Sequence, residues 1–116
     1  MGAAAGVDPE IEGGFVPETE STEEVVLRVG NSSDVKQLAS AISFALQDSK
    51  KVVLRAVGAA AVNQAAKACA VARGYVATRA VDLVVRPGFT MIDMPDVKDR
   101  SKMVSTTALI FIVSVG

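Results

Sequence analysis

The sequence contains no histidine and no tryptophan, and among its 116 residues there is one cysteine, Cys69. Without histidine the chain cannot form a Ser-His-Asp triad or a zinc site that needs an imidazole ligand. A single cysteine excludes an internal disulfide and indicates a reducing compartment. Cys69 lies on the apolar side of a predicted helix, so we interpret it as a small apolar filler rather than a nucleophile. We therefore expect no enzymatic activity, no metal site and no cofactor.

Long hydrophobic runs are also missing. The longest apolar run, Ala108 to Val113, is far too short for a membrane span. The opening MGAAAGVDPE has neither the basic nor the long apolar part of a secretory signal, and Gly6 stands where myristoylation prefers Ser or Thr. We expect a cytoplasmic protein with no membrane partner, associated with the nucleoid if bacterial, or in cytosol or nucleus if eukaryotic.

Basic residues are missing from the first part of the chain. Residues 1–24 carry seven acidic groups, whereas the other residues hold twelve Lys or Arg against six Asp. A basic fold behind an acidic leader fits a binder of nucleic acid, although a solvated surface with a solubilising tail explains the same charges. Residues 1–23 have few large apolar side chains, so we predict a disordered leader there and one folded domain over 24–116. Deleting the leader should strengthen nucleic-acid binding.

Strand and helix patterns alternate through the first half of the domain. EEVVLRVGN, from residue 23, alternates as a half-buried strand does, and a helix capped by Ser33 or Asp34 follows as far as about Gln47. KKVVLRAVG, from residue 50, repeats the strand pattern, and its helical connection makes the two strands parallel. On the first helix Phe44 lies opposite the apolar stripe, where it is either unremarkable or an anchor for a partner.

The second helix is rich in alanine. Gly58 opens it, and Gly74 stands where a left-handed C-terminal cap is expected, which predicts a helix of about fifteen residues. The helix is apolar almost all round, with Asn63 and Lys67 on a narrow polar stripe beside Val71. Either its outer side meets another subunit, or it is a plain surface helix.

Two further strands are predicted in the second half of the domain. Val81 to Ile92 reads as an edge strand interrupted at Pro87-Gly88, because proline cannot donate to the ladder. Met103 to Val115 is apolar on both alternating sides, which favours a central position. Between them MPDVKDRSK, residues 94–102, predicts a mobile hairpin tip that carries three basic side chains, Lys98, Arg100 and Lys102.

Several short motifs resemble those of the stage V sporulation protein S (SpoVS) family. They are Gly58, VNQA at 62–65, KA at 67–68, ARGY at 72–75, VDL at 81–83 and PGFT at 87–90. The resemblance extends over about residues 24–115. SpoVS proteins in turn resemble members of the wider Alba group. It implies an α/β fold of the two-layer α+β type, β-α-β-α-β-β, with a four-stranded mixed sheet in the order 1-2-4-3 and two helices on one face.

The resemblance also implies where a ligand binds. In Alba-type proteins the first strand–helix loop, the second strand–helix turn and the last hairpin contact nucleic acid, usually from a dimer. In this sequence those places hold Asn31, Ser32 and Ser33, then Arg55 and Gly58, then Lys98, Arg100 and Lys102. The lysine-rich first loop of many archaeal Alba proteins is replaced here by GNSSD, and the hairpin tip is longer than the family leads us to expect.

Two hypotheses of function follow. In the first the chain is a non-enzymatic binder of DNA or RNA that contacts backbone phosphates as a homodimer or higher oligomer, with Arg28 beside Arg55 on the open side of the sheet. Few aromatic residues are present to stack bases, so sequence-selective binding of single strands is not expected. In the second it is a sporulation or developmental regulator that acts through protein partners without nucleic acid. Candidate interface residues for either assembly are Phe44, Asn63, Lys67 and Val71.

Overall fold

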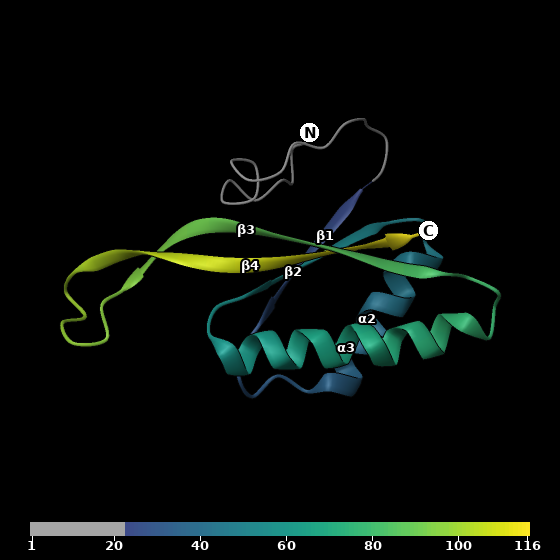
Figure 1. Ribbon diagram of the computed structural model, residues 1–116, viewed down its shortest axis with the longest axis horizontal. Helices are drawn as coiled ribbons and strands as arrows, with labels where there is room; N and C mark the ends of the chain where they lie inside the picture. The colour runs from purple at the N-terminus through teal and green to yellow at the C-terminus, as the bar shows by residue number, and fades with distance from the viewer. Residues whose placement is uncertain (1–22) are drawn as a thin grey trace.

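A computed structural model describes residues 23–116 as two layers, a four-stranded mixed sheet with two helices on one face (Figure 1). The sheet order is β1-β2-β4-β3, with β1 parallel to β2 and the other pairs antiparallel. This confirms the predicted fold and strand order. The predicted leader lies outside the described residues except for Glu23. The elements are β1 (Glu24–Val29), α2 (Val35–Gln47), β2 (Lys51–Ala56), α3 (Ala59–Ala77), β3 (Leu83–Pro95) and β4 (Met103–Val115).

The main core lies between the helices and the sheet. Val52, Leu54 and Ala56 of β2 face it, together with the alanines that line one side of α3, and all of these side chains are at most 2% exposed. Alanine lets the α3 backbone approach the sheet and α2 closely, which a core with few aromatic residues requires. Cys69 belongs to this core, and burial raises the pKa of its thiol to about 11. A thiol that stays protonated suits the filler role assigned to it.

Helix α2 has the predicted limits. The Oδ1 atom of Asp34 accepts a hydrogen bond from the backbone N–H of Gln37 at 3.0 Å, as a capping aspartate does. At the other end Ser49 takes a left-handed φ of 61°, and the N–H of Lys50 donates to the carbonyl of Ala45 at 2.9 Å. The helix therefore ends in a six-to-one hydrogen bond without a glycine.

Helix α3 does not end at Gly74, so that prediction was wrong. The helix continues through Gly74 to Ala77 and is 19 residues long. Its last turn is held by Val76, which is 1% exposed and packs into the main core one turn beyond Ala72. The left-handed position is taken by Ala80, with φ 61°, and the N–H of Val81 donates to the carbonyl of Val76 at 3.3 Å.

Strand β3 lies at the edge of the sheet as predicted, but it is not interrupted. It pairs continuously with β4 from Leu83 to Pro95, and Pro87 stands opposite Phe111 within that ladder. An edge strand tolerates proline because only one of its sides pairs. Strand β4 is central, also as predicted. Within residues 23–116, neither helix has the length and hydrophobicity that a membrane crossing demands.

Candidate nucleic-acid interface

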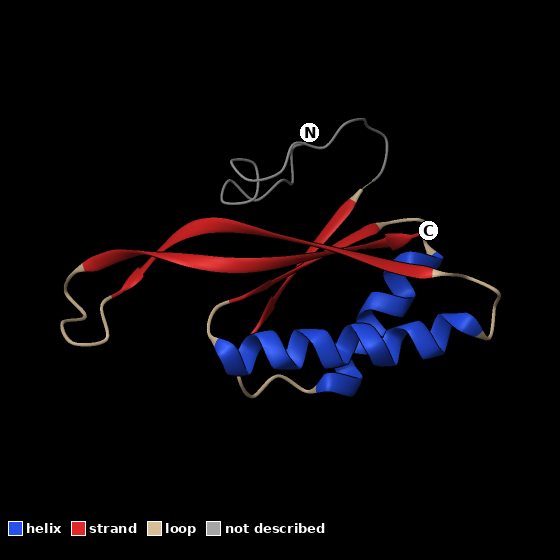
Figure 2. Cartoon of the chain, viewed as in Figure 1, coloured by secondary structure: helices blue, strands red, loops and turns tan. Residues whose placement is uncertain are grey.

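The three segments that were predicted to contact nucleic acid lie at one end of the sheet. The β1–α2 loop and the β2–α3 turn follow the carboxyl ends of two parallel strands, and such ends share one edge. Because β4 is antiparallel to β2, the β3–β4 hairpin turns at that same end (Figure 2). Sequence reasoning therefore identified segments that the fold places on one side of the molecule.

The hairpin extends well beyond the other two segments. Ala56, near the end of β2, pairs with Leu109 of β4, whereas β4 begins at Met103. Six residues of extended chain span about 20 Å. The fold thus brings the β1–α2 loop and the β2–α3 turn together, and holds the tip, residues 96–102, at the end of a two-stranded arm.

The β1–α2 loop is fixed from inside the protein. The hydroxyl of Ser33 accepts a hydrogen bond from the N–H of Gly30 at 2.8 Å, and its carbonyl accepts one from Nε2 of Gln64 at 2.8 Å. Gln64 therefore ties α3 to this loop and does not belong to the exposed polar stripe of the helix. Asn31 and Ser32 are exposed at the loop surface.

The β2–α3 turn depends on the conformation of Gly58. Its φ of 93° and ψ of 156° belong to a region that only glycine adopts without strain. A Cβ at this position would meet nothing within 4 Å, so the turn requires glycine for its dihedral angles and not for space. No side chain caps the first turn of α3, which leaves its backbone N–H groups directed toward the sheet end.

The two arginines on neighbouring strands differ in exposure. Arg28 and Arg55 are register partners across β1 and β2, on the face that points away from the helices, as predicted. Arg28 is exposed, whereas Arg55 is 7% exposed. Of the pair, Arg28 is therefore the side chain that offers its guanidinium to a large ligand.

The tip is an ordered turn that carries its cations outward. The carboxylate of Asp96 accepts a hydrogen bond from the N–H of Lys98 at 3.0 Å, and that of Asp99 accepts bonds from the N–H and hydroxyl of Ser101 at 3.1 and 2.6 Å. The two bonds from Ser101 lower the pKa of Asp99. The carboxylates thus shape the turn, and its three cations, Lys98, Arg100 and Lys102, are exposed around them, as is Val97.

The predicted interface residues lie on two different helices. Asn63 and Lys67 are exposed one turn apart on α3, and Val71 is half-buried against the main core. Phe44 is 68% exposed on α2. The α3 residues form the stripe that the helical pattern indicated, whereas Phe44 marks a separate place on the surface.

Sequence reasoning missed an apolar surface on the arm. Leu109 pairs with Ala56 of the main core and with Phe89 of β3, so this surface lies on the same side of the sheet as the helices. Figure 1 shows the arm running past the first turn of α3. The sequence feature that could have indicated this surface is the alternation of the apolar residues Phe89 and Met91 along β3. We call the four residues the arm surface: Phe89 (62% exposed), Met91 (50%), Met103 (61%) and Leu109 (41%).

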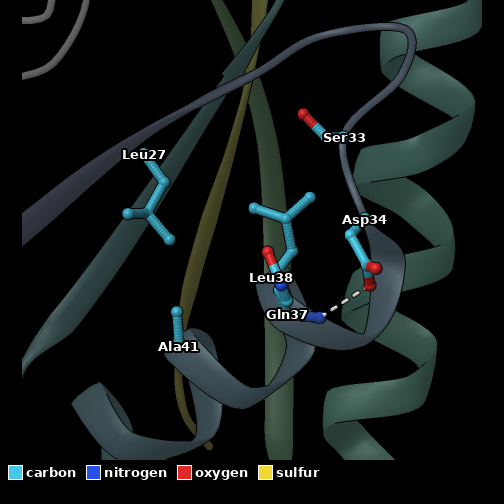
Figure 3. Close-up of a pocket in the computed structure, with 6 residues that line it drawn as sticks. All are labelled: Leu27, Ser33, Asp34, Gln37, Leu38 and Ala41. Carbon is cyan, nitrogen blue, oxygen red and sulfur yellow. Dashed lines mark hydrogen bonds between the residues drawn. The ribbon is translucent and has the colours of Figure 1, made fainter.

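A shallow depression of about 260 Å³ lies between β1 and the start of α2 (Figure 3). Its floor is apolar, and the Asp34 carboxylate at its side already accepts the capping hydrogen bond. Among residues 23–116 no cationic side chain lines it, so these residues do not make it a phosphate site. The lining residues are Leu27, Ser33, Asp34, Gln37, Leu38 and Ala41.

Comparison with known proteins identifies the family. The family model described as stage V sporulation protein S (SpoVS) matches residues 25–115. The chain belongs to the SpoVS family. Among solved structures this SpoVS-family chain is similar to Alba from Thermoplasma volcanium, with a TM-score of 0.60 and 11% sequence identity. The match covers 78% of this chain and 99% of the Alba chain, and at that identity it shows a shared fold.

Proposed function

We propose that this SpoVS-family chain is a non-enzymatic, cytoplasmic nucleic-acid-binding protein that contacts mainly backbone phosphates of DNA or RNA as a dimer. The observation that carries the proposal is the tip of the arm, where Lys98, Arg100 and Lys102 are exposed on an ordered turn. Long cationic side chains that project from the end of the arm can contact phosphates whatever the base sequence. The Alba of similar fold makes nucleic acid the first ligand to test.

The remaining elements at this end of the sheet support the same ligand. Arg28 is exposed beside the β1–α2 loop, and the uncapped first turn of α3 offers backbone N–H groups next to Gly58. Helix N-termini and arginines are both common phosphate contacts in complexes with nucleic acid. A duplex that lies along the arm is therefore the preferred geometry.

The arm surface supports assembly into a dimer. Met103 is set apart from the other three residues by the Asp93–Ser105 pair. Phe89, Met91 and Leu109 lie side by side on the two paired strands, are between 41% and 62% exposed and form one apolar area. Monomeric proteins seldom leave such an area open to water. A second copy of the chain that covers it also places two basic tips in one assembly.

A titration of labelled duplex DNA and of duplex RNA at several salt concentrations tests the proposal. The plot of log binding constant against log salt should have a slope of about −0.9 per neutralised phosphate for B-DNA. Replacing Lys98, Arg100 and Lys102 with alanine should reduce the size of that slope by about 2.7 per chain, if each contacts one phosphate. A control variant removes two exposed cations near the C-terminal end of α3, away from the candidate interface, and should leave the slope close to that of the wild type: Arg73→Ala with Arg79→Ala.

A second function is favoured by the exposure of Phe44, which fits an anchor for a protein partner. In that case the chain is a regulator of sporulation or development, in keeping with its family, and does not bind nucleic acid. The titration separates the two functions. Failure to bind either nucleic acid at low salt refutes the first and leaves the second.

A further inference from the structure

The two edges of the sheet differ in whether another strand can pair with them. On β3 the carbonyl of Asp82 accepts a hydrogen bond from the N–H of Gly116 at 2.8 Å, so the backbone groups of alternate residues from Leu83 onward point away from β4. Pro87 and Pro95 are among these residues, and neither has an N–H to offer a further strand. The β3 edge is therefore protected against pairing.

Strand β1, the other edge, contains no proline, and among residues 23–116 no strand lies on its outer side. The carbonyl of Glu23 accepts a hydrogen bond from the N–H of Lys51 at 2.9 Å, so the backbone groups of alternate residues from Glu23 onward point toward β2. The N–H and carbonyl groups of Val26 and Arg28 point the other way, out of the sheet. An edge strand that offers such groups is a template for a further strand.

A shallow apolar groove lies beside this edge, on the helix side of the sheet. Leu27 of β1 and Leu38 of α2 are half-buried in the depression between these two elements, and Ala41 is exposed in it (Figure 3). Its volume of about 260 Å³ is smaller than the roughly 300–1,000 Å³ of sites that hold drug-sized ligands, but it admits a side chain. One turn beyond Ala41, on the same side of α2, Phe44 is 68% exposed. A strand added to β1 would thus place alternate side chains over an apolar surface.

Arg28 defines the chemistry of the neighbouring position. Its side chain lies on the sheet face opposite to that of Leu27 and is exposed, and its register partner on β2 is Arg55. Side chains alternate along a strand, so a residue of an added strand that is adjacent to the one over Leu27 lies beside Arg28. Like charges side by side on a sheet repel, and guanidinium binds carboxylate through paired hydrogen bonds. An acidic residue is therefore favoured beside Arg28, next to an apolar residue over Leu27.

We propose that this edge binds an extended segment of a partner protein as a fifth, antiparallel strand. Antiparallel pairs are slightly more stable per residue than parallel ones. The segment then presents an acidic residue to Arg28 and an apolar one to Leu27, and after any residue at Val26 it has a second apolar residue. The inference goes beyond nucleic-acid binding and does not depend on it, because strand addition uses the edge opposite to β3. We call the site the β1–α2 groove, with its residues Val25, Val26, Leu27, Arg28, Ala41 and Phe44.

Titration of the full chain into a fluorescein-labelled peptide, KTELTVTK, tests the site by fluorescence anisotropy. Its glutamate and leucine are the residues proposed for Arg28 and Leu27. We expect saturable binding that weakens about tenfold or more when the peptide's leucine is replaced by alanine, because a buried aliphatic side chain is lost. Arg28→Glu in the protein should weaken binding about five- to thirtyfold, and a peptide with lysine in place of its glutamate should recover it. The control, Arg79→Glu, changes an exposed cation that follows α3 and should leave binding unchanged.

Methylated peptides distinguish strand addition from docking of side chains alone, and they leave the protein unaltered. A methyl group on the amide nitrogen of the threonine that follows the leucine removes the hydrogen bond to Val26 and should weaken binding about tenfold or more. The same methyl group on the leucine nitrogen points away from β1 and should have little effect. Amide exchange of Val26 and Arg28 should slow when the peptide is added, whereas exchange of Leu27, whose N–H points toward β2, should change little.

The proposal is overturned if the peptide does not bind, if the two methylated peptides bind equally well, or if the alanine peptide binds as tightly as the leucine peptide. It is also overturned if the amides of Val26 and Arg28 are already protected without the peptide. Protection that fades on dilution would then indicate a second copy of the chain at β1, and protection at every concentration would indicate that the chain covers this edge itself. None of these outcomes bears on the salt titration of nucleic acid, so the two proposals can fail separately.

Discussion

If the proposed dimer forms through the arm surface, replacing Phe89 with alanine should separate it while leaving the folded monomer almost unchanged. Phe89 is 62% exposed and pairs with Leu109 at the end of the arm surface nearest the β2–α3 turn. Its side chain contributes little to the core of the single chain, because most of its area already faces water. Its contribution is therefore expected in the contact between two copies.

The size of the effect follows from the exposed area. A phenylalanine side chain buries roughly 200 Å² when fully covered, so the exposed part of Phe89 amounts to about 120 Å². Covering half of it in each protomer removes about 120 Å² from water per dimer, worth about 3 kcal/mol at 25 cal/mol per Å². That free energy corresponds to a rise of roughly a hundredfold in the dissociation constant of the dimer.

Sedimentation equilibrium over a range of protein concentrations measures this constant. Phe44→Ala is the matched control, because Phe44 is 68% exposed but stands on α2, away from the arm. We expect Phe44→Ala to leave the dimer constant within a few-fold of the wild type. Dissociation caused by Phe44→Ala and not by Phe89→Ala would place the contact on α2 and refute the reasoning from the arm surface. A wild-type chain that stays monomeric at high concentration would refute it as well.

Three other predictions concern the domain itself. Gly58→Ala should lower the free energy of unfolding by about 1–3 kcal/mol, because Gly58 has a φ of 93°. Gly74→Ala, within α3, should raise the free energy of unfolding by up to about 1 kcal/mol. Urea denaturation measures both changes, and destabilisation by Gly74→Ala would mean that the helix ends at Gly74. Gln64→Ala should cost about 1 kcal/mol and speed amide exchange in residues 30–34, because it removes the bond to Ser33; unchanged exchange would show that the loop does not depend on it. Because of Cys69, the free energy of unfolding should fall as the pH rises from 9 to about 11, since the thiol loses its proton at a lower pH in the unfolded chain than when buried. Urea denaturation of Cys69→Ala should show a weaker fall over the same pH range.

Local patterns were sufficient to predict every helix and strand, since alternation and helical spacing record which side of each element is buried. Val25, Leu27 and Val29 do face the main core, and Asp34 does cap α2. The end of α3 could not be read in the same way, because it is set by the packing of Val76 against elements distant in sequence. Glycine after a run of alanines suggested a stop that this tertiary contact overrides.

The loops of the candidate site could be predicted from the sequence, but the arm and its exposed apolar residues could not. The spacing of Lys98, Arg100 and Lys102 indicated a basic tip, and the alternation of β2 placed Arg55 on the open face. The arm surface was missed because Phe89 and Met91 carry the alternation of any half-buried strand. Whether a helix covers them depends on where α3 begins relative to the start of β4, which is a property of the assembled fold and not of either segment.

The length of the arm fixes a minimum size for any ligand that touches both the tip and the β2–α3 turn. The distance between them, about 20 Å along β4, equals the rise of about six base pairs at 3.4 Å each. An oligonucleotide shorter than this can occupy one end of the span but not both, so its affinity should fall abruptly with length and not gradually. In the proposed complex, the number of residues between Met103 and Leu109 therefore sets the shortest duplex that contacts both places.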